Sequence, residues 1–160
     1  MTSVAIHTLN LHTSSAVLLA LDDVLQGARS ELVGPRAALE SAHERVMDAD
    51  HGRLLLWASV DRHPVAIVDT VMHHPGPTDL TFAQIAVAKQ ARFKGIARTL
   101  VRAAAQQAQA GEQAMDLQSV YAAVLPWAHG AQAFWASLGF EASPEWPEML
   151  WAPLRQVESP

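Results

Sequence analysis

The hydrophobic and polar positions of the first fifty residues predict one strand and two helices. Residues 4–9 alternate apolar and polar side chains, as a half-buried strand does. Ser14 and Ser15 then offer N-caps to an amphipathic helix over residues 16–32. A Gly-Pro pair ends this pattern, and its proline suits the first turn of a second helix over residues 35–46.

The middle of the chain has the pattern of a hairpin, a further strand and a long helix. Two apolar segments, 53–60 and 64–71, are separated by three polar residues and predict the hairpin. The next segment, 73–78, holds two prolines and a glycine and predicts a loop. A fourth strand over residues 80–87 precedes a helix over residues 95–110, whose apolar side chains recur every four residues.

The last third of the chain contributes a fifth strand over residues 115–124 and a helix over residues 127–138 that ends at Gly139. Phe140 and residues 149–154 supply late strands, with a proline-rich loop between them. Strands that alternate with helices predict an α/β fold built on a mixed sheet. Because the 160 residues contain no linker or internal repeat, we expect a single domain over the whole chain.

Composition narrows the possible chemistry. The chain has no cysteine, which excludes thiolate nucleophiles and thiolate zinc sites. Its formal net charge of -5 disfavours nucleic acid as a partner, because phosphate backbones are bound through accumulated Lys and Arg. No segment has the roughly 18 consecutive apolar residues of a membrane span, and no basic and apolar leader begins the chain. We therefore expect a soluble, cytoplasmic protein without a membrane partner.

The most informative polar segment connects the fourth strand to the long helix, where Arg92, Gly95 and Ala97 are spaced as Arg-x-x-Gly-x-Ala. A turn that opens a helix leaves backbone N–H groups without intrahelical partners, and with the helix dipole these groups bind phosphate-like anions. Gly95 and the small Ala97 let such a ligand approach the main chain. Arg92 and Lys94 add positive charge.

Two motifs in this order resemble the signatures of the GNAT superfamily of coenzyme A dependent N-acetyltransferases. The first is the Arg-x-x-Gly-x-Ala turn after a strand that ends in Ile85-Ala86-Val87. The second is the run from Ala131 to Phe140, AQAFWASLGF, which is similar to the A-x-x-F-Y-x-x-L-G-F run of the family. The order of the predicted elements also matches the GNAT arrangement over nearly the whole chain.

The resemblance implies the GNAT fold, a central mixed β-sheet of six to seven strands with splayed parallel strands four and five, flanked by about four helices. It also implies acetyl-CoA as the cofactor and direct transfer of the acetyl group to an amine in a ternary complex. Main-chain groups at the end of the fourth strand would bind the pantetheine amides, and the following turn would bind the pyrophosphate. The resemblance places these residues against the cofactor: Ile85, Ala86, Val87, Arg92, Phe93, Lys94, Gly95, Ile96, Ala97, Arg98, Ala131, Phe134 and Trp135.

The sequence departs from the family where a general base is expected on the fourth strand. The family positions, six and four residues before Val87, hold Thr81 and Ala83, and neither side chain ionises usefully. By the two-residue period of a strand, Asp79 lies on the same face and is a candidate base that acts through water. Its other interpretation is a turn carboxylate, and an amine that arrives neutral needs no base. Thr81 stays a candidate through its position alone.

The sequence also departs from the family where a proton donor is expected. The usual tyrosine, which protonates the leaving thiolate, falls at Trp135, whose indole N–H is not an acid at working pH. A frequent asparagine falls at Ala128. The only tyrosine, Tyr121 in the fifth strand, is the candidate replacement, and packing in the core is its other interpretation. A catalytically weak or inactive acyl-CoA-binding module therefore stays open as an alternative.

The acceptor is expected to be a primary amine of a small molecule or a peptide, and no motif identifies it. A superfamily toxin that acetylates aminoacyl-tRNA is a third interpretation, which the acidic net charge disfavours. The adjacent His73 and His74 have no third ligand at suitable spacing, so no metal is expected. Trp146, among prolines and glutamates, is a candidate to line the acceptor pocket or to contact a second copy in a homodimer.

Overall fold

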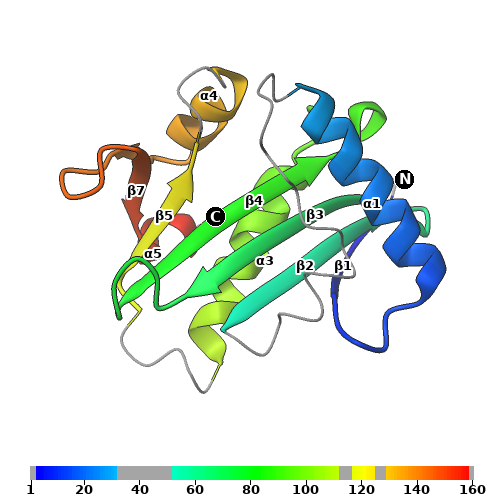
Figure 1. Cartoon of the computed structure of the whole chain (residues 1–160), viewed down its shortest axis with the longest axis horizontal. Coiled ribbons are helices and arrows are strands. Elements are labelled where there is room, and N and C mark those ends of the chain that lie inside the picture. The colour runs from blue at the N-terminus through cyan, green and yellow to red at the C-terminus, as the bar shows by residue number, and fades with distance from the viewer. Residues whose placement is uncertain (1–2, 32–51, 112–116, 125–128, 159–160) are drawn as a thin grey trace.

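Seven strands form one mixed sheet, with α1 crossing one face and α3 packed on the other (Figure 1). The computed structural model describes residues 3–31, 52–111, 117–124 and 129–158. The strands are β1 (Val4–Thr8), β2 (Arg53–Val60), β3 (His63–Met72), β4 (Asp79–Val87), β5 (Ser119–Ala123), β6 (Glu141–Ala142) and β7 (Met149–Pro153). The helices are α1 (Ser15–Glu31), α3 (Ile96–Ala110), α4 (His129–Ser137) and α5 (Leu154–Glu158), with a 3₁₀ turn over Lys89–Ala91.

The strand order is β1-β2-β3-β4-β5-β7-β6. β4 and β5 are parallel, whereas the other neighbouring strands are antiparallel. The predicted mixed α/β sheet with parallel strands four and five is therefore confirmed. None of the helices within the described residues is long and apolar enough to cross a membrane.

Local sequence explains where several elements begin. The Ser14 hydroxyl accepts a hydrogen bond from the Val17 N–H at 3.3 Å and caps α1. The turn between β2 and β3 contains only Asp61 and Arg62, both at positive φ, as two-residue hairpin turns require. His63, which the sequence placed in this turn, therefore begins β3.

Three predicted elements are only partly described or differ in extent. The second helix expected over residues 35–46 lies outside the described residues, as do the first residues of the expected fifth strand and last helix. Their described parts are β5 and α4. The sequence did not predict α5, because its five residues follow β7 directly and are too few to show a helical repeat.

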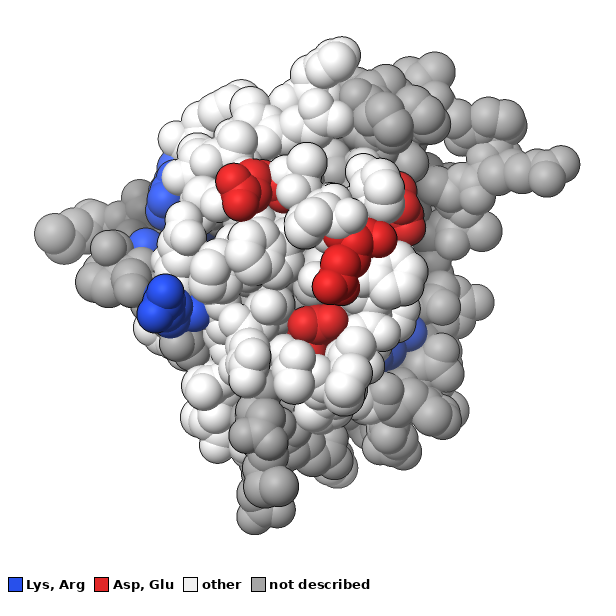
Figure 2. All heavy atoms as spheres, turned by 90° about the vertical axis from the view of Figure 1, so that its left-hand side faces the viewer, with Lys and Arg blue, Asp and Glu red and all other residues white. Residues whose placement is uncertain are grey.

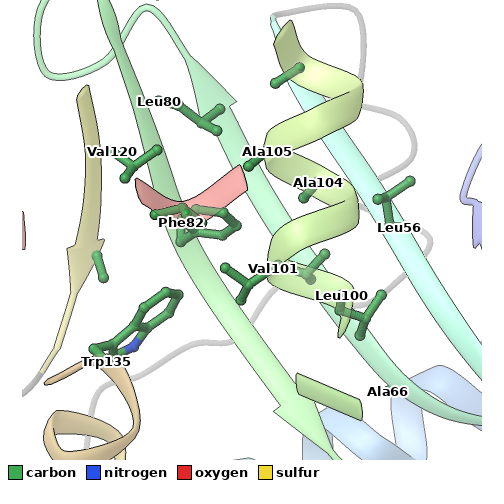
Figure 3. Packing of buried hydrophobic residues seen from close by; sticks show 14 of the residues in the cluster. Leu56, Ala66, Leu80, Phe82, Leu100, Val101, Ala104, Ala105, Val120 and Trp135 are labelled. Atoms are coloured by element: carbon green, nitrogen blue, oxygen red, sulfur yellow. The ribbon is translucent and has the colours of Figure 1, made fainter. Parts of the chain in front are cut away.

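Two hydrophobic clusters fix the helices to opposite faces of the sheet. In the α3 cluster, Val101 of α3 packs with Phe82 of β4, and Trp135 of α4 extends the same cluster (Figure 3). In the α1 cluster, Leu21 packs with Ile67 of β3. Buried area on both faces makes the sheet a rigid support for the residues at its centre.

A β-bulge interrupts β4 at Ala83. Asp69 of β3 lies opposite Gln84, and the next residue, Thr70, lies opposite Phe82. Ala83 therefore has no partner on β3, which is the extra residue of a bulge. Nothing in the local sequence predicts this insertion, because it is defined by the pairing of two strands.

The bulge exchanges the faces to which the β4 side chains point. Phe82 before it and Val87 after it both pack in the α3 cluster, although they are five positions apart and would lie on opposite faces of a regular strand. Asp79 and Thr81 consequently lie on the opposite face from Val87, because side chains alternate along a strand. The expectation that these three residues share one face is wrong, and the extra residue Ala83 is the reason.

Candidate active site

Strands β4 and β5 pair over part of their length and then separate. Pairing runs from Asp79 opposite Ser119 to Phe82 opposite Ala122. Beyond this point β4 continues to Val87, with β3 as its described partner. Figure 1 shows the two strands diverging toward α4. Among the residues that the structure describes, no strand pairs with the outer edge of β4 along residues 83–87, so this edge can take a ligand.

The open edge presents the main-chain groups of Ile85 and Val87. The Ala88 N–H donates to the Val65 carbonyl of β3 at 2.7 Å. Successive residues of a strand direct their N–H and C=O groups to opposite sides, so those of Val87 and Ile85 point away from β3. The same alternation turns the main-chain groups of Ala86 toward β3, and the role expected for Ala86 is corrected accordingly.

The turn before α3 provides backbone donors for an anion. The first intrahelical hydrogen bond runs from the Thr99 N–H to the Gly95 carbonyl at 3.0 Å. The N–H groups of Ile96, Ala97 and Arg98 therefore have no acceptor inside the helix. Gly95 has φ of 78°, and a Cβ placed on it would meet no atom within 4 Å. The space in front of the turn is open, and its donors and helix dipole suit a diphosphate.

The side chains of this turn have different surroundings. Arg92 donates from Nε to the Val87 carbonyl at 3.0 Å, which ties the turn to the end of β4. Phe93 and Lys94 are exposed, and the Phe93 backbone has φ of 60°. Lys94 is therefore the side chain of the turn best placed to add charge to the anion site.

The α4 residues expected near the cofactor are divided between surface and core. Ala131 is exposed. Trp135 is 3% exposed and lies near Phe82 (Figure 3), with 5.3 Å between the two ring centroids. Its ring centroid is also 5.1 Å from that of Phe134 and 4.8 Å from that of Phe140. The indole is thus a core side chain. Position 128, where the family often has asparagine, lies outside the described residues.

Tyr121 lies at the end of the paired section of β5, opposite Thr81 and on the face away from α3. Only 5% of the residue is exposed. Burial raises the pKa of Tyr121 above 10.0, the charges of Asp79 and Glu145 raise it further, and a hydrogen bond with Ser143 acts in the opposite direction. The phenol is therefore protonated at neutral pH, which a proton donor requires.

Asp79 and Thr81 are both engaged in local hydrogen bonds. Asp79 Oδ2 accepts from the Gly76 N–H at 2.9 Å. Thr81 donates from Oγ1 to the His74 carbonyl at 2.6 Å, and the His74 ring nitrogen Nδ1 lies 3.3 Å from the same hydroxyl. These contacts stabilise the loop before β4 and favour the turn interpretation of Asp79. A carboxylate can accept several hydrogen bonds, so Asp79 still has capacity for a water.

The sequence did not reveal two neighbours of Tyr121, namely Ser143 and Glu145 in the β6–β7 loop. Ser143 Oγ also accepts from the N–H of Trp146 at 3.0 Å, and Trp146 is 40% exposed. The loop reaches Tyr121 because β7 pairs with β5, with Trp151 opposite Tyr121. The proline and glutamate content marked this segment as a loop, but no local pattern indicates its partner.

Carboxylates collect on the side of the molecule that carries β6, β7 and the loop between them. Glu141, Glu145 and Glu148 are exposed there. Figure 2 shows Asp and Glu side chains gathered on this side, with Lys and Arg toward its margin. The described residues contain no group of three His, Asp or Glu side chains that could hold a metal ion. The local field therefore attracts cations and repels polyanions.

The open strand edge and the glycine turn both lie within a segment that matches a known protein family. The model of the Acetyltransferase (GNAT) family matches residues 20–140. The chain belongs to the GNAT family. Members of this family use acetyl-CoA, which is therefore the cofactor. The structure fits it, because the open β4 edge offers backbone partners for an extended amide chain and the Gly95 turn has room for a diphosphate.

Solved structures share the fold at low sequence identity. An acetyltransferase from Thermus thermophilus is 19% identical, with a TM-score of 0.69 and coverage of 96% of this chain and 99% of that one. A GNAT-family acetyltransferase from Staphylococcus aureus is 12% identical, with a TM-score of 0.72 and coverage of 95% and 99%.

A third structure holds a ligand. The PaiA N-acetyltransferase from Thermoplasma acidophilum, in complex with coenzyme A, is 13% identical, with a TM-score of 0.68 and coverage of 93% of this chain and 96% of that one. A comparison with curated protein sequences finds no match. At these identities the likeness shows the fold alone.

Proposed function

We propose that this GNAT protein moves the acetyl group of acetyl-CoA directly to a primary amine within a ternary complex. The observation that carries the proposal is the separation of β4 from β5 after Phe82 and Ala122, next to the open turn at Gly95. Acetyl-CoA supplies the acetyl group as an activated thioester. The groups of Ile85 and Val87 on the open edge bind the pantetheine amides, and one of their N–H groups stabilises the oxyanion.

Tyr121 is the proton donor in this proposal. Tyr121 lies one residue before the last paired residue of β5, on the face of the sheet opposite α3. Like an ordinary tyrosine it carries its proton at neutral pH, and burial shifts its pKa further upward. A phenol of this kind can protonate a departing thiolate, which takes over the function that Trp135 cannot serve.

Asp79 is the proposed base and acts through a water molecule. It lies on the same face as Tyr121, because the paired Thr81 and Tyr121 define that face and Asp79 is two residues before Thr81. Its contact with the Gly76 N–H fixes the carboxylate without consuming its acceptor capacity. An amine that arrives neutral bypasses this step.

The acceptor in this proposal is a cationic amine, either a small molecule or a peptide. The exposed carboxylates of the β6–β7 side favour the approach of ammonium groups. The same charges repel a tRNA backbone, which disfavours the toxin interpretation. The partly exposed Trp146 in this loop is a proposed contact for the acceptor or for a second copy of the chain in a homodimer.

The burial of Trp135 favours a second candidate function, a CoA-binding module with little or no catalysis. At 3% exposure in an aromatic cluster, this side chain takes no part in proton transfer. The module and the enzyme both bind acetyl-CoA, so cofactor binding does not distinguish them.

Release of free thiol from acetyl-CoA, followed with a thiol reagent, tests the proposal. The acceptor panel contains polyamines, amino acids, aminoglycosides and peptides. Thiol release that requires one of these amines supports the transferase. Binding of acetyl-CoA, seen as a raised melting temperature, without turnover on the whole panel supports the module. Absence of both binding and turnover rejects the proposed function.

A further inference from the structure

A pocket of about 350 Å³ lies between α3, the end of α4 and α5. Its lining comes from all three helices: Arg98, Val101 and Arg102 from α3, residues 136–139 at the end of α4, and Gln156 and Val157 from α5. This volume falls in the range of pockets that bind small molecules.

Two arginines, one helical turn apart, bring positive charge to the pocket. Arg98 donates from Nη2 to Ser137 Oγ at 3.1 Å, and the Ser137 hydroxyl donates to the Phe134 carbonyl at 2.6 Å. Arg102 Nε is buried and has no hydrogen-bond partner among the described residues. A buried donor without an acceptor destabilises the protein, and a reorientation of the Arg102 side chain toward an anion in the pocket would give it that acceptor.

Gln156 adds a further polar group. Gly139 has φ of 88°, and its missing Cβ leaves the space that the Gln156 amide occupies. Gln156 therefore packs directly on the Gly139 main chain, and its amide offers N–H donors at the pocket. The described lining contains no carboxylate. Its polar groups thus combine two guanidinium groups with hydroxyl and amide donors, which together favour an anion.

We propose that this pocket binds a phosphate group through Arg98 and Arg102. The planar guanidinium matches two phosphate oxygens at once, and Arg102 Nε gains the acceptor that it lacks. The volume exceeds that of phosphate alone, so part of the molecule that bears the phosphate also enters the pocket.

Two sources supply this chemistry. One is the 3′-phosphate of coenzyme A, since Arg98 lies in the first turn of the helix whose start holds the diphosphate. In that case the inference rests on the proposed function. The other is a separate phosphorylated small molecule that binds beside the cofactor.

The first arm of the test compares dissociation constants of coenzyme A and 3′-dephospho-coenzyme A by calorimetry. The variant is Arg102→Gln, and the charge-matched control is Arg62→Gln in the exposed β2–β3 turn. If the phosphate comes from the cofactor, Arg102→Gln raises the dissociation constant of coenzyme A roughly tenfold and leaves that of 3′-dephospho-coenzyme A unchanged. Arg102→Lys keeps the charge but loses the guanidinium Nε. Its affinity for coenzyme A is expected to lie between those of the wild type and Arg102→Gln. Melting curves verify that each variant is folded.

The second arm titrates inorganic phosphate into protein saturated with 3′-dephospho-coenzyme A, with sodium chloride at equal ionic strength as the reference. If a separate ligand is the source, phosphate raises the melting temperature of the wild type and of Arg62→Gln but not of Arg102→Gln. Equal coenzyme A affinities in all variants together with no phosphate effect overturn the proposal. A wild type that binds neither form of coenzyme A rejects the proposed function instead, and a phosphate titration of the ligand-free protein then judges the pocket by itself.

Discussion

Arg53 holds Asp69 through two hydrogen bonds beside the bulge of β4, from Nε to Oδ1 at 3.2 Å and from Nη2 to Oδ2 at 2.6 Å. The Asp69 side chain is 2% exposed, and Asp69 lies opposite Gln84, the residue that follows the bulge. A carboxylate this deeply buried requires a cationic partner. The ion pair therefore fixes β3 at the position where β4 exchanges its faces.

Asp69→Asn is expected to lower the free energy of unfolding by about 3 kcal/mol, because the Arg53 guanidinium loses the ion pair with the buried Asp69 carboxylate. Asparagine has nearly the same volume, so the loss reflects charge and not a cavity. Urea unfolding followed by circular dichroism measures it. Asp61→Asn, at an exposed carboxylate in the β2–β3 turn, is the control and should change stability by less than about 0.5 kcal/mol. Equal losses in both variants would contradict a specific role for the pair.

Tyr121→Phe is expected to lower kcat by about tenfold to a hundredfold, because it removes the proposed proton donor while keeping the ring. The KM for acetyl-CoA should stay unchanged, since the cofactor is held by main-chain groups of β4 and the Gly95 turn. Initial rates of thiol release give both constants. An unaltered kcat would show that the thiolate leaves without help from this hydroxyl.

The raised pKa of Tyr121 predicts a loss of stability at alkaline pH. Above pH 10 the unfolded chain releases the phenolic proton while the folded protein still holds it, so the unfolded state gains stability as the pH rises. The free energy of unfolding contributed by this group is therefore complete below that pH and is lost above it. Melting temperatures of wild type and Tyr121→Phe between about pH 8 and pH 11 test this. Above pH 10, and only there, the melting temperature of Tyr121→Phe should rise relative to that of the wild type. A difference between the two melting temperatures that does not change with pH would refute the expectation.

Gly95→Glu is expected to abolish coenzyme A binding, because the side chain would enter the space in front of the turn and place a negative charge there. Gly95→Ala is the matched variant. It imposes the same left-handed strain, about 1 kcal/mol, but adds only a methyl group. Calorimetry should find measurable affinity in the alanine variant and none in the glutamate variant. Similar coenzyme A affinity in both variants would show that the diphosphate does not bind at this turn.

Phe93→Asn is expected to raise the free energy of unfolding by about 0.5 to 1 kcal/mol. The Phe93 backbone has φ of 60°, which is unfavourable for a bulky residue and tolerated by asparagine. Its ring is exposed, so little packing is lost. Phe93→Ala removes the ring and keeps the strained backbone, and its stability should stay near that of the wild type. Thermal unfolding that ranks alanine equal to asparagine would show that the ring, not the backbone, matters.

The order of strands and helices was readable from the sequence because it follows from local periodicity. The apolar residues of α3 recur every four positions, and the Gly95 turn is contiguous in the chain. Contiguous features of this kind need no knowledge of tertiary pairing. The glycine turn was therefore predicted from the residues themselves, whereas the parallel β4–β5 pair was expected only through the resemblance to the GNAT superfamily. The bulge at Ala83 was not predicted, because an alanine carries no signal of its missing partner.

The surroundings of the proposed acid depend on contacts between distant segments. Ser143 and Glu145 approach Tyr121 only because β7 pairs with β5. Trp135 stands where the family's motif has a tyrosine, and only the packing shows that its ring belongs to the core. The buried Nε of Arg102 is likewise invisible in a helical pattern that places this residue on the outer face.

The extra residue in β4 also determines where new chemistry can be introduced into this scaffold. A carboxylate engineered at position 84 would emerge on the face that carries Tyr121, directly opposite Asp69, whereas the same substitution at 85 would direct its charge toward the α3 cluster. Deleting Ala83 would leave both outcomes unchanged, because Phe82 and Gln84 would then be consecutive residues that alternate between the two faces as in a regular strand. The face that a substituted β4 side chain reaches is therefore set by a one-residue offset as much as by the amino acid introduced.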